Sequence, residues 1–135
     1  MTSKPTTILI VQHDFLVAER LRLLLGRAGY EIVGVAARTH GAAELAARHH
    51  PDLAIVDMML EVDVDGIRTA TELARRHLMK ILITTGFPDS VIEAEGVPDL
   101  ACAIVRKPYT DDELLAGVAR CLAQGQQGDP PAGSA

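Results

Sequence analysis

The sequence is poor in aromatic residues and has no excess of positive charge. Aromatic side chains make up 3% of the 135 residues, and tryptophan is absent. The core must therefore be aliphatic, and platforms on which nucleic-acid bases stack are not expected. The formal net charge is −5 at pH 7. A protein with this negative net charge lacks the excess of basic residues that is typical of nucleic-acid-binding proteins.

Long apolar runs are missing as well. No stretch approaches about 18 consecutive apolar residues, and the N-terminus has no signal-peptide core. We therefore expect no membrane insertion and no export, and hence a cytoplasmic protein. Only two cysteines occur, Cys102 and Cys121, both in segments with a buried pattern. Without an export signal, they are predicted to be reduced core residues rather than a disulfide.

The sequence does contain a strict alternation of two apolar patterns. Short apolar runs predict strands, and segments with helical apolar spacing follow each of them. Strands are predicted at 8–11, 31–36, 53–57, 80–85 and 101–105. Helices are predicted at 15–28, 39–49 (capped by Thr39), 65–78, 91–95 (a turn and a half) and 111–122 (opened by a capping box at Thr110 and Glu113).

Such alternation predicts an α/β fold with right-handed crossovers, a parallel sheet of five strands and helices on both faces. We assign residues 1–123 to this domain. Residues 124–135 are rich in glycine, glutamine and proline and have no apolar anchor, so they are predicted to be a disordered C-terminal tail.

The strand at 53–57 is uniformly apolar until it ends in Asp57, a pattern typical of a strand buried on both faces. In open α/β sheets, ligands bind at the carboxyl ends of the strands. A carboxylate, a hydroxyl and an ammonium collected there are suited to phosphoryl chemistry: the carboxylate attacks phosphorus, and the other two bind phosphoryl oxygens. The polar residues predicted at this edge are Gln12, His13, Asp14, Asp57, Thr84, Thr85 and Lys107, the last followed by Pro108.

These residues resemble the motifs of response-regulator receiver domains of two-component signalling. The resemblance covers roughly residues 7–122 and rests on three features in order: a strand ending in Asp57, a strand ending in Thr85 before Gly86, and the pair Lys107-Pro108. It implies a flavodoxin-like doubly wound sheet of order 2-1-3-4-5. It also implies that Asp57 accepts a phosphoryl group, assisted by Mg²⁺, from a sensor histidine kinase or a histidine phosphotransfer protein. Lys107 would bind the phosphate and Thr85 would act as the switch.

The chain departs from this family in three places. Two acidic residues that help to hold Mg²⁺ normally follow the first strand, and Gln12 and His13 stand there instead. Metal ligation is left to Asp57 and Asp14, so weakened Mg²⁺ binding is predicted, because Mg²⁺ prefers hard oxygen ligands. A protonated His13 would make the site sensitive to pH. Ile104 stands where an aromatic switch residue is common, and the helix at 91–95 is short.

Two functions from different classes remain open. The first is a stand-alone receiver that is phosphorylated on Asp57 and signals by contact with a downstream protein, with pairing into a homodimer as a further option. The second is a pseudo-receiver, a binding module that works without phosphorylation of Asp57. We expect no enzyme: an aspartyl phosphatase of the haloacid-dehalogenase type has a second acid two residues after the nucleophile, and here that position is Met59.

Overall fold

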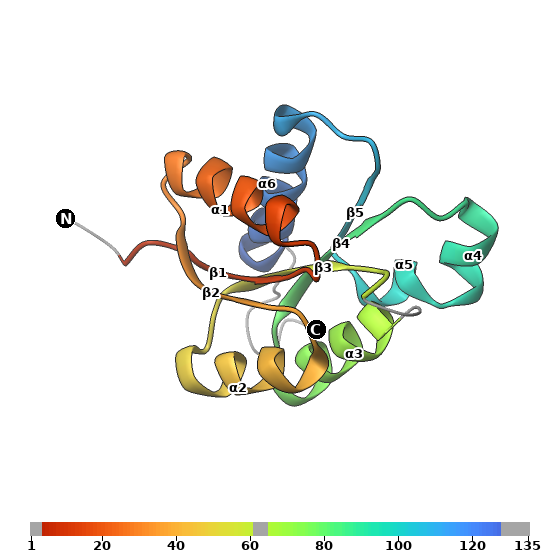
Figure 1. Cartoon of the computed structure of the whole chain (residues 1–135), viewed down its shortest axis with the longest axis horizontal. Helices are drawn as coiled ribbons and strands as arrows, with labels where there is room; N and C mark the ends of the chain where they lie inside the picture. The colour runs from red at the N-terminus through yellow and green to blue at the C-terminus, as the bar shows by residue number, and fades with distance from the viewer. Residues whose placement is uncertain (1–3, 61–64, 128–135) are drawn as a thin grey trace.

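The computed structural model of the chain describes residues 4–60 and 65–127 (Figure 1). Its strands are β1 (Thr7–Val11), β2 (Glu31–Ala36), β3 (Leu53–Asp57), β4 (Lys80–Thr85) and β5 (Ala103–Arg106). Its helices are α1 (Phe15–Arg27), α2 (Thr39–His49), α3 (Asp65–Arg76), α4 (Asp89–Ala94), α5 (Val97–Leu100) and α6 (Asp111–Gln127).

The strands form one parallel sheet in the order β2-β1-β3-β4-β5, which confirms the predicted topology. Strand β3 lies at the centre of this sheet, and every one of its residues is buried. Asp57 ends the strand and pairs in register with Thr84 of β4. The uniform apolar pattern of β3 is therefore explained by its two covered faces.

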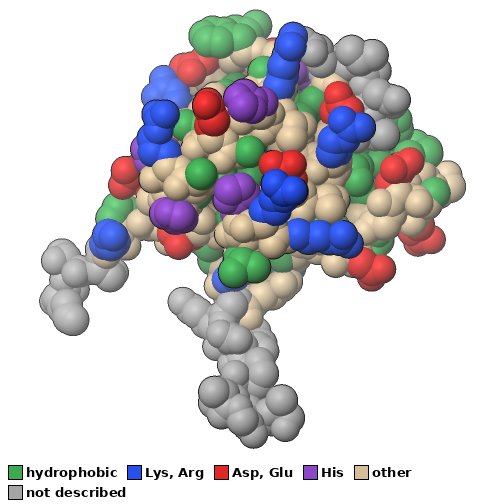
Figure 2. All heavy atoms as spheres, turned by 90° about the horizontal axis from the view of Figure 1, so that it is seen from below, with side chains coloured by type: hydrophobic (Ala, Val, Ile, Leu, Met, Phe, Trp, Pro, Cys, Tyr) green, Lys and Arg blue, Asp and Glu red, His purple; other side chains and the backbone are tan. Residues whose placement is uncertain are grey.

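The helices cover both faces of the sheet, so two aliphatic cores form. In Figure 1, α1 and α6 lie on one side of the sheet, and α2 and α3 lie on the other. Alternate residues of β1 serve the two cores: Ile8 and Ile10 pack toward α1 and α6, and Leu9 and Val11 toward α2 and α3. Figure 2 shows histidine, lysine and arginine side chains mixed with acidic ones on the outer surface of the layer that contains α2 and α3. Within the described residues, no helix has the length and apolar character that spanning a membrane requires.

Three helix predictions differ from the structure. The capping box is confirmed, because the Thr110 amide donates to Glu113 Oε1 at 2.8 Å and the Glu113 amide donates to Thr110 Oγ1 at 3.1 Å. Helix α6 nevertheless continues to Gln127, so residues 124–127 are helical rather than part of the predicted tail, and 128–135 lie outside the described residues. Thr39 is not a cap. It is the first residue of α2, and its hydroxyl bonds to that of Thr69 in α3.

The third difference concerns the segment between β4 and β5. One short helix was predicted at 91–95, closed by Gly96 and Pro98, whereas the structure has α4 and then α5. Pro98 lies in the first turn of α5. Proline is tolerated there because the amide hydrogens of a first turn have no partner within the helix.

The cysteines are joined in a disulfide, so the prediction of two free thiols is wrong. Cys102 lies just before β5 and Cys121 lies in α6, and the fold brings their Cα atoms to 5.2 Å. This separation suits a disulfide. The prediction rested on expected compartment alone, and the sequence does not reveal that α6 packs its cysteine against the start of β5.

Gly66 at the start of α3 lies against the backbone that follows Asp57. A Cβ atom on Gly66 would lie 1.9 Å from the carbonyl oxygen of Asp57 and 2.7 Å from that of Met58. The Gly66 amide donates to the Met58 carbonyl oxygen at 3.1 Å. Only glycine allows α3 to approach the end of β3 so closely.

We predict that Gly66→Ala lowers the free energy of unfolding by about 1–3 kcal/mol, because a methyl group must displace rigid backbone atoms. Gly26 in α1 is the matched control, since a Cβ there meets nothing within 4 Å. Gly26→Ala should stabilise the protein by about 0.5–1 kcal/mol, because alanine is the better helix former. Urea unfolding of the two variants measures both effects. Equal shifts would contradict the importance of this close approach.

Candidate functional site

Asp57 is a buried carboxylate held by three donors from three parts of the chain. Its residue exposure is 3%. Its Oδ2 accepts from Lys107 Nζ at 2.6 Å and from Gln12 Nε2 at 2.8 Å, and its Oδ1 accepts from the Met59 amide at 3.0 Å. A buried carboxylate without partners would be costly. These three donors offset the loss of water around it.

The orientation of the Gln12 amide is fixed by its neighbours. Gln12 is buried, and its Oε1 accepts from the Asp14 amide at 3.0 Å while its Nε2 donates to Asp57. Turning the amide over would set NH₂ against an N–H and oxygen against a carboxylate, so the opposite assignment is unfavourable. Gln12 therefore presents a hydrogen-bond donor to Asp57, at a position where the resemblance implies an acid.

Asp14 and His13 take other places around the site. The Asp14 carboxylate caps α1, because its Oδ1 accepts from the amides of Leu16 at 2.9 Å and Val17 at 3.2 Å. An aspartate at this position stabilises a helix start. His13 is exposed and lies on the wall of a cavity that Asp57 also lines. The sequence placed both residues beside Asp57, and the structure gives the carboxylate of Asp14 a structural role.

Thr85 is fully buried, and its hydroxyl is engaged by neighbouring residues of the core. The hydroxyl donates to the sulfur of Met58 at 3.2 Å and accepts from the Phe87 amide at 3.0 Å. Thr85 also lines a cavity of about 280 Å³ together with Asp57, Met59, Gly86, Phe87 and Lys107. The structure thus brings the predicted switch residue to the same cavity as Asp57, without a direct bond between them.

Lys107 reaches Asp57 from the loop after β5. Its amide donates to the Thr85 carbonyl oxygen at 2.8 Å, which fixes the start of this loop to the end of β4. The peptide between Lys107 and Pro108 is cis. Ile104, at the position of the expected aromatic residue, is half-buried against the core on the side of α2 and α3.

A second cavity beside Asp57 includes a residue that the sequence did not suggest. This cavity, about 340 Å³, is lined by Asp57, Lys107, Pro108, Tyr109 and residues of α1, among others. Burial raises the pKa of the Tyr109 hydroxyl above its ordinary value of 10.0, and the negative charge of Asp57 raises it further. Arg20 acts in the opposite direction, and Asp111 adds a smaller rise. Tyr109 directly follows the Lys107-Pro108 motif, and that was the only signal of its position.

The arrangement supplies donors for a phosphoryl group and few ligands for a metal. Lys107, Gln12 and the Met59 amide all point hydrogens toward Asp57. Among residues 4–60 and 65–127, no group of three or more His, Cys, Asp or Glu side chains is placed to hold a metal ion. The resemblance implies an acidic pocket for Mg²⁺, and the described residues do not provide that set of acids.

The doubly wound parallel sheet with the order β2-β1-β3-β4-β5 places the chain in the flavodoxin-like class of α/β folds. The carboxyl edge of this sheet carries the buried Asp57 carboxylate and its partner Lys107. Its family is also clear. The model of the response regulator receiver domain matches residues 8–119, and the chain belongs to this family. Receiver domains of this family are generally non-enzymatic signalling modules that interact with histidine kinases or phosphotransfer proteins.

Similar proteins agree with this assignment. The chain is 32% identical over 114 residues to the transcriptional regulatory protein PdtaR of Mycobacterium tuberculosis, covering 84% of this chain and 55% of the relative. It is 29% identical over 126 residues to the sensory transduction protein RegX3 of Mycobacterium bovis, covering 92% of this chain and 54% of the relative. The chain thus spans about half the length of these curated relatives.

Solved structures share the fold over nearly the whole chain. The receiver domain of a modulated diguanylate cyclase from Desulfovibrio desulfuricans G20 superposes with a TM-score of 0.83 at 27% identity, covering 93% of this chain and 100% of that one. A LuxR-family two-component response regulator from Aurantimonas sp. SI85-9A1 gives a TM-score of 0.79 at 26% identity, covering 89% and 86%.

Tyr109 provides an optical measure of the charge at Asp57. The chain has two tyrosines, so a Tyr30→Phe background leaves Tyr109 as the single titrating phenol. In this background we predict that Asp57→Asn lowers the pKa of Tyr109 and that Arg20→Gln raises it, because the two charges act in opposite directions. Absorbance at alkaline pH measures the titration. Shifts of the same sign in both variants would contradict the electrostatic coupling.

Proposed function

We propose that the chain accepts a phosphoryl group on Asp57 from a histidine kinase or a phosphotransfer protein and signals by contact with a downstream protein. The observation that carries this proposal is the Asp57–Lys107 pair, because it combines a nucleophilic carboxylate with a cation 2.6 Å away. The side chain of Lys107 is 38% exposed, whereas that of Asp57 is 4% exposed. The ammonium can therefore move with an incoming phosphoryl group.

In the transfer step, one bond to phosphorus forms and one breaks. A carboxylate oxygen of Asp57 attacks the phosphorus of a phosphohistidine, the bond from phosphorus to the imidazole nitrogen breaks, and the released imidazole takes up a proton. The acyl phosphate carries about two negative charges. Lys107 and the Gln12 amide already face this position and would donate to the new oxygens, and Thr85 would turn its hydroxyl toward them.

This proposal includes a weakened need for Mg²⁺. In the described residues, Gln12 supplies hydrogen-bond donors where a metal ligand would have to supply oxygen. Lys107 and Gln12 both donate to Asp57 Oδ2, and the positive charge of Lys107 offsets the negative charge of Asp57. The phosphoryl charge would then be stabilised chiefly by fixed donors.

The pseudo-receiver is the alternative, and one observation favours it. Among the described residues, Asp57 accepts from three protein donors, and the Thr85 hydroxyl is engaged with Met58 and Phe87. A site satisfied in this way is suited to a module that binds partners in one fixed state.

Incubation with acetyl phosphate, in Mg²⁺ or in EDTA, separates the two functions. A receiver should gain the mass of one phosphoryl group in both conditions, with a rate that EDTA lowers by less than about tenfold. Asp57→Asn should abolish the adduct. Lys107→Ala should slow its formation by about 10²–10³, the usual cost of losing one such charge-stabilising donor. No adduct in any condition, including with a cognate kinase, would support the pseudo-receiver.

Gln12→Glu tests the metal dependence separately. The new carboxylate would face that of Asp57, so we predict a loss of about 1–3 kcal/mol in stability without metal and a gain in melting temperature on addition of Mg²⁺. The melting temperature of the unchanged protein should respond little to Mg²⁺. The opposite pattern, in which the unchanged protein shows the larger Mg²⁺ response, would contradict the proposed weakening.

The phosphodonor protein would contact the start of α1. Phe15 and Leu16 are 72% and 75% exposed, and they follow directly on Gln12, His13 and Asp14 beside Asp57. Exposed apolar residues of this size suit contact with a partner. Leu78 is more exposed, at 86%, but it precedes β4 and so lies at the opposite edge of the sheet.

We predict that Leu16→Ser slows transfer from a phosphohistidine protein by about tenfold or more, since an interface anchor is typically worth over 1 kcal/mol. Its reaction with acetyl phosphate should not change. Leu78→Ser, the matched control, should leave both reactions unchanged. Transfer rates of radiolabelled phosphate measure the effect, and equal slowing by the two variants would argue against a contact at α1.

A further inference from the structure

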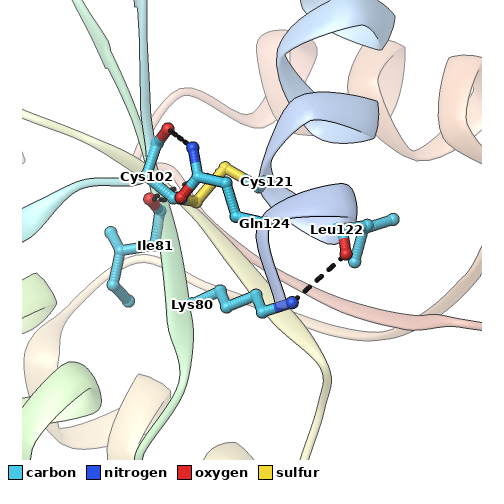
Figure 3. The surroundings of a disulfide bond; sticks show 6 residues. All are labelled: Lys80, Ile81, Cys102, Cys121, Leu122 and Gln124. Atoms are coloured by element: carbon cyan, nitrogen blue, oxygen red, sulfur yellow. Dashed lines mark hydrogen bonds between the residues drawn. A yellow bond between two sulfur atoms is a disulfide. The ribbon is translucent and has the colours of Figure 1, made fainter. Parts of the chain in front are cut away.

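The disulfide encloses the part of the chain that carries Lys107. Cys102 and Cys121 are 19 residues apart in sequence. Between them lie β5, the Lys107-Pro108 peptide, Tyr109 and the first turns of α6. Figure 3 shows the bond between the start of β5 and α6, close to Ile81 of β4. The ammonium that pairs with Asp57 is thus delivered by a segment closed covalently at its base.

The two cysteine residues differ in burial. Cys121 is fully buried in the core formed with α1, whereas Cys102 is only partly buried. Cys102, the less buried residue, is therefore the expected point of attack for an external thiolate. Thiol–disulfide exchange requires such access to one sulfur.

The surroundings suit both the disulfide and the pair of thiols. The sulfur of Cys102 lies 3.0 Å from the Ile81 carbonyl oxygen, and that of Cys121 lies 4.0 Å from the same atom. In the disulfide neither sulfur carries a proton. After reduction, the Cys102 thiol would have an acceptor in place.

Two further contacts would hold α6 after the disulfide opens. Gln124 Nε2 donates to the Cys102 carbonyl oxygen at 2.9 Å, and Lys80 Nζ donates to the Leu122 carbonyl oxygen at 3.3 Å (Figure 3). The first bond joins the same two regions as the disulfide, and the second joins α6 to the start of β4. Reduction would thus loosen the segment while leaving the domain folded.

We propose that Cys102 and Cys121 are a redox-active pair, which exchanges with a dithiol oxidoreductase and so sets how firmly the segment bearing Lys107 is held against the sheet. A thiolate of the dithiol attacks the Cys102 sulfur, the bond to Cys121 breaks, and the Cys121 sulfur leaves with the electron pair and takes up a proton. The second thiol of the reductant then attacks the mixed disulfide and releases Cys102 as a thiol. The protein gains two electrons and two protons, and the dithiol becomes a disulfide.

The first experiment measures the reactivity of each sulfur. In Cys121→Ser the remaining Cys102 thiol should react with a small aromatic disulfide reagent at least tenfold faster than the Cys121 thiol does in Cys102→Ser. The circular dichroism of both variants verifies that they are folded. Equal rates, or a faster Cys121, would overturn the assigned point of attack.

The second experiment compares the oxidised and reduced protein by hydrogen exchange. Dithiothreitol should reduce the folded protein in the absence of denaturant, and an oxidised dithiol should restore the bond. We expect amides in 103–121 to exchange at least tenfold faster after reduction, including that of Lys107, which donates to Thr85. Amides of α1 should not change. The double variant Cys102→Ser/Cys121→Ser should match the reduced pattern and should not respond to dithiothreitol.

Three results would overturn the proposal: two free thiols that an oxidised dithiol does not join, reduction only in denaturant, or unchanged exchange in 103–121. The last two would leave a purely structural disulfide. None of these measurements depends on phosphorylation of Asp57. The redox pair and the proposed phosphoacceptor can therefore succeed or fail independently.

Discussion

The burial of the Asp57 carboxylate is the constraint on which this structure depends. A charge with 3% exposure is tolerated only when donors replace the lost water. Strand β1 lies directly beside β3, so Gln12, the residue that follows β1, can reach Asp57 with its side chain. Strand β5 lies two strands away, at a spacing of about 10 Å, and only a long side chain such as that of Lys107 spans this distance. The strand order and the lengths of the Gln12 and Lys107 side chains therefore together determine which donors reach Asp57.

The Gln12 amide changes the balance of charge at this site. An acid at this position would add negative charge beside Asp57 and would need a cation to offset it. Gln12 instead donates a hydrogen bond to Oδ2, and its own oxygen is held by the Asp14 amide. Asp14, the nearest described alternative, is engaged as the cap of α1. The local structure around β1 therefore favours a pocket whose charge is balanced by Lys107.

The sequence was sufficient for the sheet and for the position of the main site residues, because both follow from short-range patterns. Apolar runs marked the strands, and the polar residues after them had to meet at one edge. Other features depend on contacts between distant segments. Gly66 lies within the helix predicted at 65–78, and no local pattern reveals its approach to the Asp57 carbonyl oxygen. The orientation of the Gln12 amide likewise depends on a backbone donor two residues away. The disulfide pairs residues whose separation in sequence carries no signal.

Strand β5 connects the disulfide to the lysine that pairs with Asp57. The disulfide lies before its first residue, and Lys107 follows its last. With a rise of about 3.3 Å per residue, the two sites are too far apart for direct contact. Coupling between them must pass through the position and order of β5 and its loop. Because the Lys107 amide is bonded to the Thr85 carbonyl oxygen at the edge of β4, loosening β5 at its base acts first on its pairing with β4. Any effect on Asp57 then depends on how firmly the pairing of β5 with β4 fixes the position of Lys107.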